Sequence, residues 1–225
     1  MSEHMSKASH KIPPKEPDRI RPALDLTRTV ARELFLYRTR PWDAIPGLQS
    51  YIRNHGHELP YDGYDEVSES VWVHVSAYLS PTARLEAPVI ICGGARIGHY
   101  ACIGGSIIGS FATVGELSQV KNSILFDKSK LCGHNSVMSS IIGYEATLGA
   151  NSTIPDTRLD GMNVTFDMPE GMYVSGKAHL GAVVCDDVKV GASCVINPGS
   201  VVDHGSKLYP LTSVSGYIYP YSVIH

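Results

Sequence analysis

The protein has 225 residues, a length that suits one large domain or one domain with an appendage. Its 19 Lys and Arg against 22 Asp and Glu give a formal net charge of −3, which argues against a nucleic-acid binder that relies on bulk positive charge. With 43% hydrophobic and 18% charged residues, the chain has enough apolar material for a core and too little charge for a disordered protein.

The N-terminal 22 residues are rich in proline and charge, which predicts a disordered arm over 1–22. This stretch lacks the apolar core of a signal peptide, and no run in the chain is long enough to cross a bilayer, so we expect a soluble, cytoplasmic protein that does not bind membranes. The cysteines are odd in number and none are spaced Cys-x-x-Cys. We therefore expect free thiols in a reducing compartment, with neither a disulfide framework nor a zinc site.

Helical patterns occupy the next part of the chain, over residues 23–70. Asp25 is a candidate N-cap for an amphipathic helix whose apolar face recurs at steps of four, four and three. A second short helix is predicted with Pro46 in its first turn and its end at His55-Gly56. The apolar face of the first helix consists of Leu26, Val30, Leu34 and Tyr37.

An internal repeat begins after residue 71 and dominates the rest of the chain. Aliphatic residues recur every six positions, and a five-residue step returns every 17 residues. A second block with the same six-residue step starts at Val184. The first block reads Val73, Leu79, Leu85, Ile91, Ile97, Ile103, Ile108, Val114, Val120, Leu125, Leu131, Val137, Ile142, Leu148 and Ile154, and the second reads Val184, Val190, Ile196, Val202, Leu208 and Val214.

A period of six fits neither a helix nor a flat strand, but it fits short strands joined by tight turns. Three units, less one residue at a corner, close a triangular coil of 17 residues, and coils stack at the strand spacing of about 4.8 Å. The sequence therefore predicts an all-β solenoid, a parallel β-helix of about seven coils that follows the short helical segment. Its first five coils cover 71–154, a protruding loop covers 155–183, and two further coils with a cap cover 184–225.

Units such as Ile97-Gly98-His99-Tyr100-Ala101-Cys102 resemble the hexapeptide-repeat acyltransferases, whose β-helix is left-handed. A closer resemblance over roughly 97–215 is to the acetyltransferase domain of bifunctional N-acetylglucosamine-1-phosphate uridyltransferases and to the C-terminal region of archaeal sugar-phosphate nucleotidyltransferases. The residues that carry this resemblance are Ser129-Lys130-x-x-Gly133-His134, Leu148-Gly149-Ala150 and Ile196-Asn197-Pro198-Gly199.

The resemblance implies a transferase that uses acetyl-CoA or another acyl-CoA, with His134 as the catalytic base and Lys121 as a contact to sugar phosphate. A histidine suits this role because its ordinary pKa of about 6.5 lies near working pH. Lys130 is a further candidate for substrate binding. The 17-residue coil adds that Asn151 occupies the slot of His134 in the next coil, about 4.8 Å away, where it would orient the ring or bind substrate.

Two polar residues of the resembled family are replaced here, by Val137 and Thr147. Their loss leaves two hypotheses open. The first is acyl transfer to the amine of a sugar phosphate or nucleotide-linked amino sugar. The second is a non-catalytic β-helix module that assembles or binds a sugar nucleotide. The residues before the repeat are too few for a nucleotidyltransferase domain and hold no glycine-rich phosphate loop.

The same coil arithmetic stacks His99 on Glu116, and Lys128 on Glu145 as a surface ion pair. A three-histidine zinc site would lack a ligand at His99 and His134, so we expect no metal and a simple hydrogen bond between His99 and Glu116.

The 155–183 loop contributes two cations. Arg158 and Lys177 are candidate contacts to phosphates of the substrate or the acyl-CoA, and Ala192 is a further candidate for the acyl-CoA site. The resemblance implies a homotrimer, and the tyrosine-rich C-terminus suits the cap of an end coil.

Overall fold

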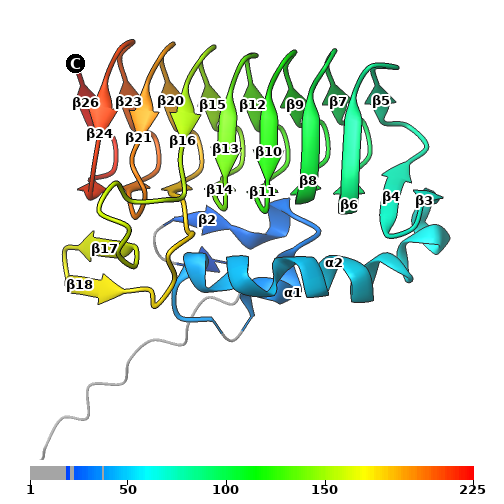
Figure 1. Ribbon diagram of the computed structural model, residues 1–225, viewed down its shortest axis with the longest axis horizontal. Coiled ribbons are helices and arrows are strands. Elements are labelled where there is room, and N and C mark those ends of the chain that lie inside the picture. The colour runs from blue at the N-terminus through cyan, green and yellow to red at the C-terminus, as the bar shows by residue number, and fades with distance from the viewer. Residues whose placement is uncertain (1–18, 21–22, 37) are drawn as a thin grey trace, which may run out of the picture.

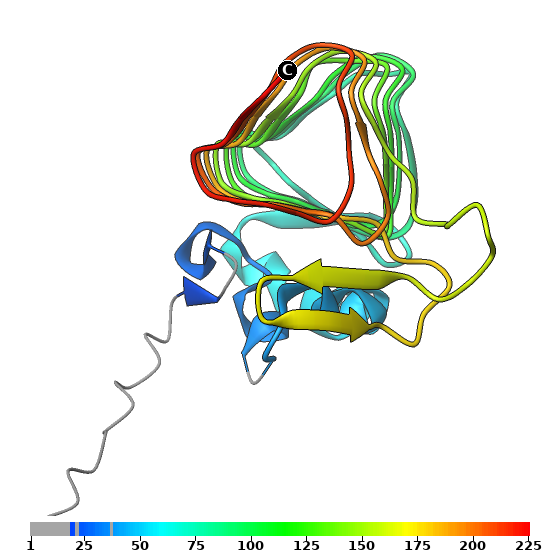
Figure 2. The same cartoon turned by 90° about the vertical axis from the view of Figure 1, so that its left-hand side faces the viewer.

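The structure is a computed structural model that describes residues 19–20, 23–36 and 38–225. Most of the chain forms a triangular prism of short parallel strands, seen from the side in Figure 1 and along its axis in Figure 2. Strands in neighbouring coils pair at an offset of 17 residues, as in Lys130 beside Thr147 and Ile124 beside Ile141. The parallel β-solenoid and its 17-residue coil are therefore confirmed.

One face of the prism is an eight-stranded parallel sheet, and each of its strands belongs to a different coil. The solenoid thus has eight coils along this face rather than seven. The prediction stopped at Val214 because the next interior residue, Ile218, follows after four positions instead of six. The strands are β5 (Tyr78–Leu79), β7 (Arg96–Ile97), β9 (Thr113–Val114), β12 (Lys130–Leu131), β15 (Thr147–Leu148), β20 (Lys189–Val190), β23 (Lys207–Leu208) and β26 (Val223–Ile224).

The other two faces share one 14-stranded sheet, because β6 and β8 are long enough to run through both. The second face holds β10 (Gln119–Lys121), β13 (Ser136–Met138), β16 (Thr153–Ile154), β21 (Val195–Ile196) and β24 (Ser213–Val214). The third face holds β4 (Val71–His74), β11 (Ile124–Leu125), β14 (Ile141–Ile142), β19 (Val183–Val184), β22 (Val201–Val202) and β25 (Tyr217–Ile218). The spanning strands are β6 (Arg84–Ile91) and β8 (Cys102–Ile108), and β3 (Tyr64–Ser68) pairs antiparallel with β4.

The aliphatic residues of the repeat fill the interior of the prism and form one continuous core. All are buried except Leu79 and Leu85, which lie near its first end and are partly buried. Each fully buried aliphatic side chain contributes about 1.5–3 kcal/mol relative to an exposed one, so this column is the main source of the solenoid's stability.

The third face carries a second core on its outer side. There, each short strand places one aliphatic residue inside the prism and another outside, and the outer ones pack against other parts of the chain. Two segments cover them: residues 23–36 and 38–62, and the hairpin of β17 (Thr165–Met168) and β18 (Gly171–Val174). We call these two segments the docked layer, which Figure 2 shows below one side of the triangle. The outer residues are Ile90, Ile107, Ile124, Ile141, Val183 and Val201.

The N-terminal part of the docked layer is more broken than predicted. The expected helix from Asp25 is two short pieces, because Thr29 is extended at φ −157°. Asp25 does cap the first piece, since its carboxylate accepts from Thr27 N at 3.0 Å, whereas Tyr37 lies outside the described residues. The pieces are η1 (Leu26–Arg28) and α1 (Arg32–Phe35), followed by η2 (Pro41–Gly47), α2 (Leu48–Gly56) and η3 (Leu59–Asp62).

The second predicted helix is confirmed as α2, and it ends at Gly56 as expected. Pro46, however, lies in η2 rather than in the first turn of α2. Of the predicted arm, residues 1–18 and 21–22 lie outside the described residues. Arg19 and Ile20 form strand β1 (Arg19–Ile20), which pairs with β2 (Leu24–Asp25) and so corrects the prediction of disorder for these two.

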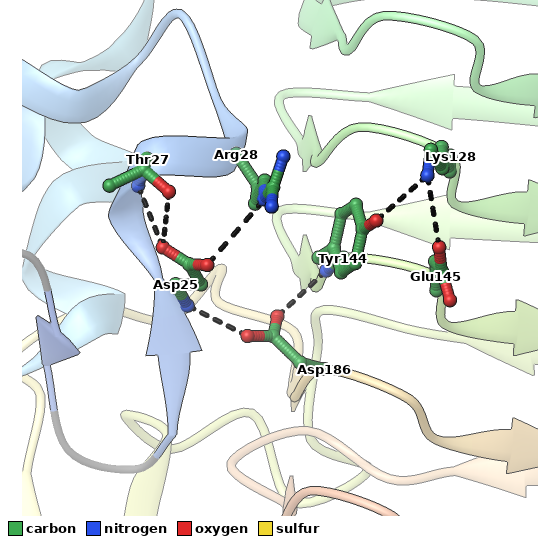
Figure 3. A network of polar contacts seen from close by, with 7 residues as sticks. All are labelled: Asp25, Thr27, Arg28, Lys128, Tyr144, Glu145 and Asp186. Carbon is green, nitrogen blue, oxygen red and sulfur yellow. Dashed lines mark hydrogen bonds and ion pairs between the residues drawn. The ribbon is translucent and has the colours of Figure 1, made fainter.

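A polar network anchors the N-terminal segment to the prism (Figure 3). The Asp186 carboxylate accepts hydrogen bonds from Asp25 N and from Tyr144 N, both at 2.7 Å. Arg28 lies over the ring of Tyr144 at 5.0 Å, and Lys128 donates to the Tyr144 hydroxyl at 2.9 Å. One buried carboxylate thus holds two backbone segments 161 and 42 residues away from it in sequence.

The hairpin, which belongs to the predicted protruding loop, lies against both the prism and the N-terminal segment. Phe166 stacks on Trp42 with a centroid distance of 3.9 Å and an interplanar angle of 3°. The base of β17 meets the corner at Gly199, where an added Cβ would lie 2.0 Å from Thr165 O. Gly199 also has φ +77°, so both space and backbone conformation require glycine at this contact.

Candidate functional site

His134 and Asn151 lie at the same corner of neighbouring coils, as the 17-residue offset predicted. Both residues have left-handed backbone, at φ 53° and 61°, and Asn151 N donates to Gly133 O at 3.0 Å. Both side chains are exposed. The Asn151 amide donates to Ser193 Oγ at 3.2 Å in the following coil, rather than to the His134 ring. The corner therefore stacks the two residues without an orienting hydrogen bond between them.

Lys121 lies at the other end of the same face. It pairs in register with Met138, four residues beyond His134, which corresponds to about 13 Å of extended strand. Its ammonium forms an ion pair with Glu86, and this hydrogen bond lowers the pKa of the Glu86 carboxyl. Lys130 is exposed on β12, on a different face of the prism. The structure does not gather these two lysines around His134.

Arg158 is held by a neighbour in its own loop. Its Nε and Nη2 donate to the two Asp160 carboxylate oxygens at 3.0 and 2.5 Å, and this pair lowers the Asp160 pKa to about 2. Arg158 lines a cavity of about 740 Å³ together with Asn197 and Gly199. Lys177 and Ala192 are exposed and do not line this cavity.

The expected hydrogen bond between His99 and Glu116 is wrong. The stacking itself is right, because Leu117 N donates to His99 O at 2.9 Å. The His99 Nδ1 instead lies 2.8 Å from Ser80 Oγ and 3.1 Å from Thr82 Oγ1, whose hydroxyls reach it from the preceding coil. The predicted Lys128–Glu145 ion pair is present at 3.2 Å.

A second cavity, of about 570 Å³, lies where the docked layer meets the last coils. The sequence analysis did not anticipate it. Its walls come from three separate parts of the chain: the N-terminal segment, the hairpin and the corner after β22. The lining residues are Ala23, Thr39, Arg40, Trp42, Met168, Glu170, Tyr173, Asp203, His204, Tyr217 and Pro220.

Asp203 and His204 form a carboxylate–histidine pair on the wall of this cavity. The nearly buried Asp203 accepts from His204 N at 2.7 Å and lies 3.2 Å from His204 Nδ1, and the Tyr217 hydroxyl donates to its other oxygen. Burial acts to raise the Asp203 pKa, but the hydrogen bonds from Tyr217 and His204 outweigh it, so the pKa is lowered. The pair thus holds a negative charge beside an imidazole.

This arrangement prepares His204 to act as a base. A carboxylate next to Nδ1 favours the tautomer with its proton on that nitrogen, which leaves Nε2 as the acceptor. The ring is partly open, with 33% of the side chain exposed, and it packs edge-on against Tyr221 at 4.7 Å. A histidine that is oriented by a carboxylate and faces a cavity has the geometry that general-base chemistry needs.

A sequence signal for this pair was present. Asp203-His204 directly follows the strand Val201–Val202, at a corner of the repeat. The repeat predicted that corner, yet the cavity around it depends on the docked layer, which the repeat does not encode. Among the described residues, no cluster of three or more His, Cys, Asp or Glu side chains could hold a metal ion.

Comparison with protein families places the repeat. A family model described as the GMPPB C-terminal domain matches residues 85–206, more than half of the chain. The chain belongs to this family. The match covers most of the solenoid and ends just beyond the Asp203–His204 pair.

Individual relatives are more distant. The uncharacterized acetyltransferase YaiX of Escherichia coli O6:K15:H31 is 26% identical over 106 residues, which cover 47% of this chain and 46% of the relative. The bifunctional protein GlmU of Methanococcus vannielii is 28% identical over 170 residues, which cover 74% of this chain and 41% of the relative. The chain therefore spans less than half the length of these curated relatives.

Solved structures give looser matches. PerB from Caulobacter crescentus, in complex with CoA and GDP-perosamine, has a TM-score of 0.30 at 22% identity and covers 75% of this chain and 61% of its own. AntD, an N-acyltransferase from Bacillus cereus in complex with dTDP and coenzyme A, has a TM-score of 0.39 at 16% identity, with coverages of 68% and 74%. Superpositions this loose carry no argument about the site. In the part of the chain that the structure describes, no helix has the length and apolarity to span a bilayer.

Proposed function

We propose that the protein transfers an acyl group, such as acetyl, from an acyl-CoA to the amine of a sugar phosphate or nucleotide-linked amino sugar. The observation that carries the proposal is the Asp203–His204 pair on the wall of the 570 Å³ cavity. The acetyltransferase name of the relative YaiX supports the reaction class. A cavity of this size lies within the range of about 300–1,000 Å³ that is usual for small-molecule sites.

The reaction needs a base because an amine that attacks a thioester must lose a proton. The amine nitrogen forms the new bond to the acyl carbon, the carbon–sulfur bond breaks, and the proton taken by the base is returned to the leaving CoA thiolate. His204 Nε2 is placed to accept that proton, and Asp203 stabilises the imidazolium that forms. The acyl-CoA enters as a co-substrate.

His134 is the rival base, as the resemblance to the uridyltransferase acetyltransferase domain implies. Its exposed imidazole is not paired with a carboxylate among the described contacts, which favours His204. Under the His134 assignment, Asn151 orients the ring or binds substrate, Lys121, Lys130 and Arg158 bind substrate, and Lys177 and Ala192 contact the acyl-CoA. We also propose a homotrimer that works in the cytoplasm, as that resemblance implies, and light scattering of the purified protein tests the trimer.

Release of CoA from acetyl-CoA, followed by chromatography with a panel of amino sugars and their phosphates and nucleotides, tests the proposal. We expect His204→Ala to lower kcat/KM by about 10²- to 10⁴-fold, because that is the usual contribution of a general base. His134→Ala, the matched control, should retain wild-type activity. The reverse order would move the site to the His134 corner.

The alternative is a non-catalytic module that assembles or binds a sugar nucleotide. The interior position of Val137, which is fully buried in the prism, favours it, because a polar side chain there would not reach a substrate. This alternative predicts no CoA release above background for the wild type or for either histidine variant, and such a result would overturn acyl transfer.

A further inference from the structure

The 570 Å³ cavity presents charges of both signs to a single ligand. Arg40 brings a guanidinium from the N-terminal segment, while Asp203 and Glu170 bring carboxylates from the last coils and from the hairpin. Asp203 is 5% exposed, so its charge is directed at what the cavity holds. A ligand that satisfies all three groups carries both an anion and a cation.

The guanidinium is positioned by an aromatic ring. Arg40 lies over the Tyr173 ring at 4.2 Å from its centroid, a stacking that fixes the plane of the group. A fixed planar guanidinium matches the oxygens of a phosphate in a bidentate way, which a flexible ammonium does not. Because no described ion pair involves Arg40, its charge is available to a ligand within the described part of the chain.

The cavity also has an unmatched hydrogen-bond donor. Trp42 is 3% exposed, lines the cavity and has no hydrogen-bond partner for Nε1 among the described residues. A buried donor without a partner costs about 1–3 kcal/mol, which a ligand oxygen would recover. Its ring is already fixed on one face by Phe166, so the donor is rigidly placed.

We propose that this cavity binds the acceptor, a phosphorylated amino sugar carried on a nucleotide. Arg40 binds the phosphates, Trp42 Nε1 donates to a sugar or phosphate oxygen, and the amine lies at the carboxylate side of the cavity beside His204. This inference rests on the proposed function and deepens it by naming the substrate class and the residues that select it. Both Arg40 and Trp42 come from the docked layer, so recognition lies outside the hexapeptide repeat.

The two tryptophans of the chain make binding measurable without catalysis. Trp42 lines the cavity, whereas Trp72 is fully buried on β4 in the first coil, far along the prism from the last coils (Figure 1). A ligand in the cavity should therefore change the fluorescence of Trp42 alone. The probes are UDP-glucosamine, UDP-glucose, which lacks the amine, and glucosamine, which lacks the nucleotide.

We expect saturable quenching by UDP-glucosamine in the full-length wild type, with an affinity at least about tenfold higher than for either probe that lacks one charge, a difference of about 1.4 kcal/mol. Arg40→Gln should weaken binding by at least about tenfold. Arg96→Gln is the matched control, because Arg96 also lies over a tyrosine ring, Tyr78 at 5.3 Å, but outside the cavity. A thermal melt of each variant checks that it is folded.

Equal titrations for wild type, Arg40→Gln and Arg96→Gln, or no fluorescence change with any probe, would overturn the inference. If CoA release then persists with an amino sugar, the proposed function stands and the acceptor binds elsewhere. If quenching depends on Arg40 but no acyl-CoA is consumed with any acceptor, the binding site stands and acyl transfer fails.

Discussion

The prism and the docked layer are stabilised in different ways. In the prism, the same aliphatic slot is filled in every coil, and each strand pairs with neighbours about 17 residues away. In the docked layer, single contacts carry the attachment, such as Trp42 on Phe166 and Asp186 with Asp25 N. The prism therefore tolerates variation at its surface but not inside, whereas the docked layer depends on a few particular residues.

The same difference separates architecture from the candidate site. The repeat builds a rigid surface, and its exposed corners carry His134 and Asn151 without enclosing them. A cavity forms only where the docked layer closes over the last coils beside His204. A solenoid alone thus provides a scaffold, and irregular segments seated on it supply enclosure.

The largest effect is expected from a charge inside the prism. Leu125→Asp places a carboxylate at a fully buried interior slot. An unpaired charge there costs more than about 5 kcal/mol, comparable to the whole stability of a typical domain, so we expect loss of cooperative folding by circular dichroism. Leu117→Asp, at a corner where the leucine is 53% exposed, should keep the wild-type melt. Equal damage from both variants would contradict the division between interior and surface.

A smaller and local effect is expected in the docked layer. Phe166→Ala removes the ring that stacks on Trp42, and large-to-small substitutions of buried aromatics cost about 3–5 kcal/mol. Hydrogen exchange should speed up in the hairpin and in residues 38–62 while the prism strands keep their protection. The control is Phe111→Ala, because that ring is 67% exposed. Uniform loss of protection across the prism would show that the two regions unfold as one unit.

The smallest effect is a change in pH dependence. Burial raises the pKa of Asp186 to about 6, above the value of about 3.9 for an unfolded chain. The folded protein therefore holds this proton more tightly, so the contribution to stability is full below about pH 4 and is lost as pH rises through about 6. Asp186→Asn removes that dependence.

Across pH 4 to 6.5, the free energy of unfolding of the wild type should thus fall relative to that of Asp186→Asn by about 2–3 kcal/mol, at about 1.4 kcal/mol per pKa unit. Denaturant melts at each pH measure the difference. Asp65→Asn, a change of an exposed carboxylate on β3, controls for the loss of one charge. A constant difference between wild type and Asp186→Asn would contradict the raised pKa.

The prism could be predicted because its rule is local and repeated. A period of six, with a return at 17, left few alternatives for residues such as Ile97 and Leu131, and both are interior. The coil count fell short because the step from Val214 to Ile218 breaks the period. His134 and Asn151 were also placed correctly in adjacent coils, since their relation follows from the same rule.

The docked layer followed no such rule, although the sequence held one signal for it. Strands such as Ile124–Leu125 and Ile141–Ile142 are aliphatic at both positions, whereas Lys130–Leu131 alternates polar and apolar. A doubly aliphatic strand is expected where both faces of a sheet are covered. The pattern thus indicates a covered face, but the identity of its cover depends on contacts between residues far apart in sequence, such as Trp42 and Phe166.

A crystal structure of the protein with CoA and a nucleotide-linked amino sugar tests most directly whether the docked layer and the last coils enclose the active site. Our account predicts the sugar amine within about 2.6–3.2 Å of His204 Nε2, the reach of a general base, and the phosphates against Arg40. An acceptor bound at the His134 corner, with the cavity beside His204 free of ligand, would contradict it.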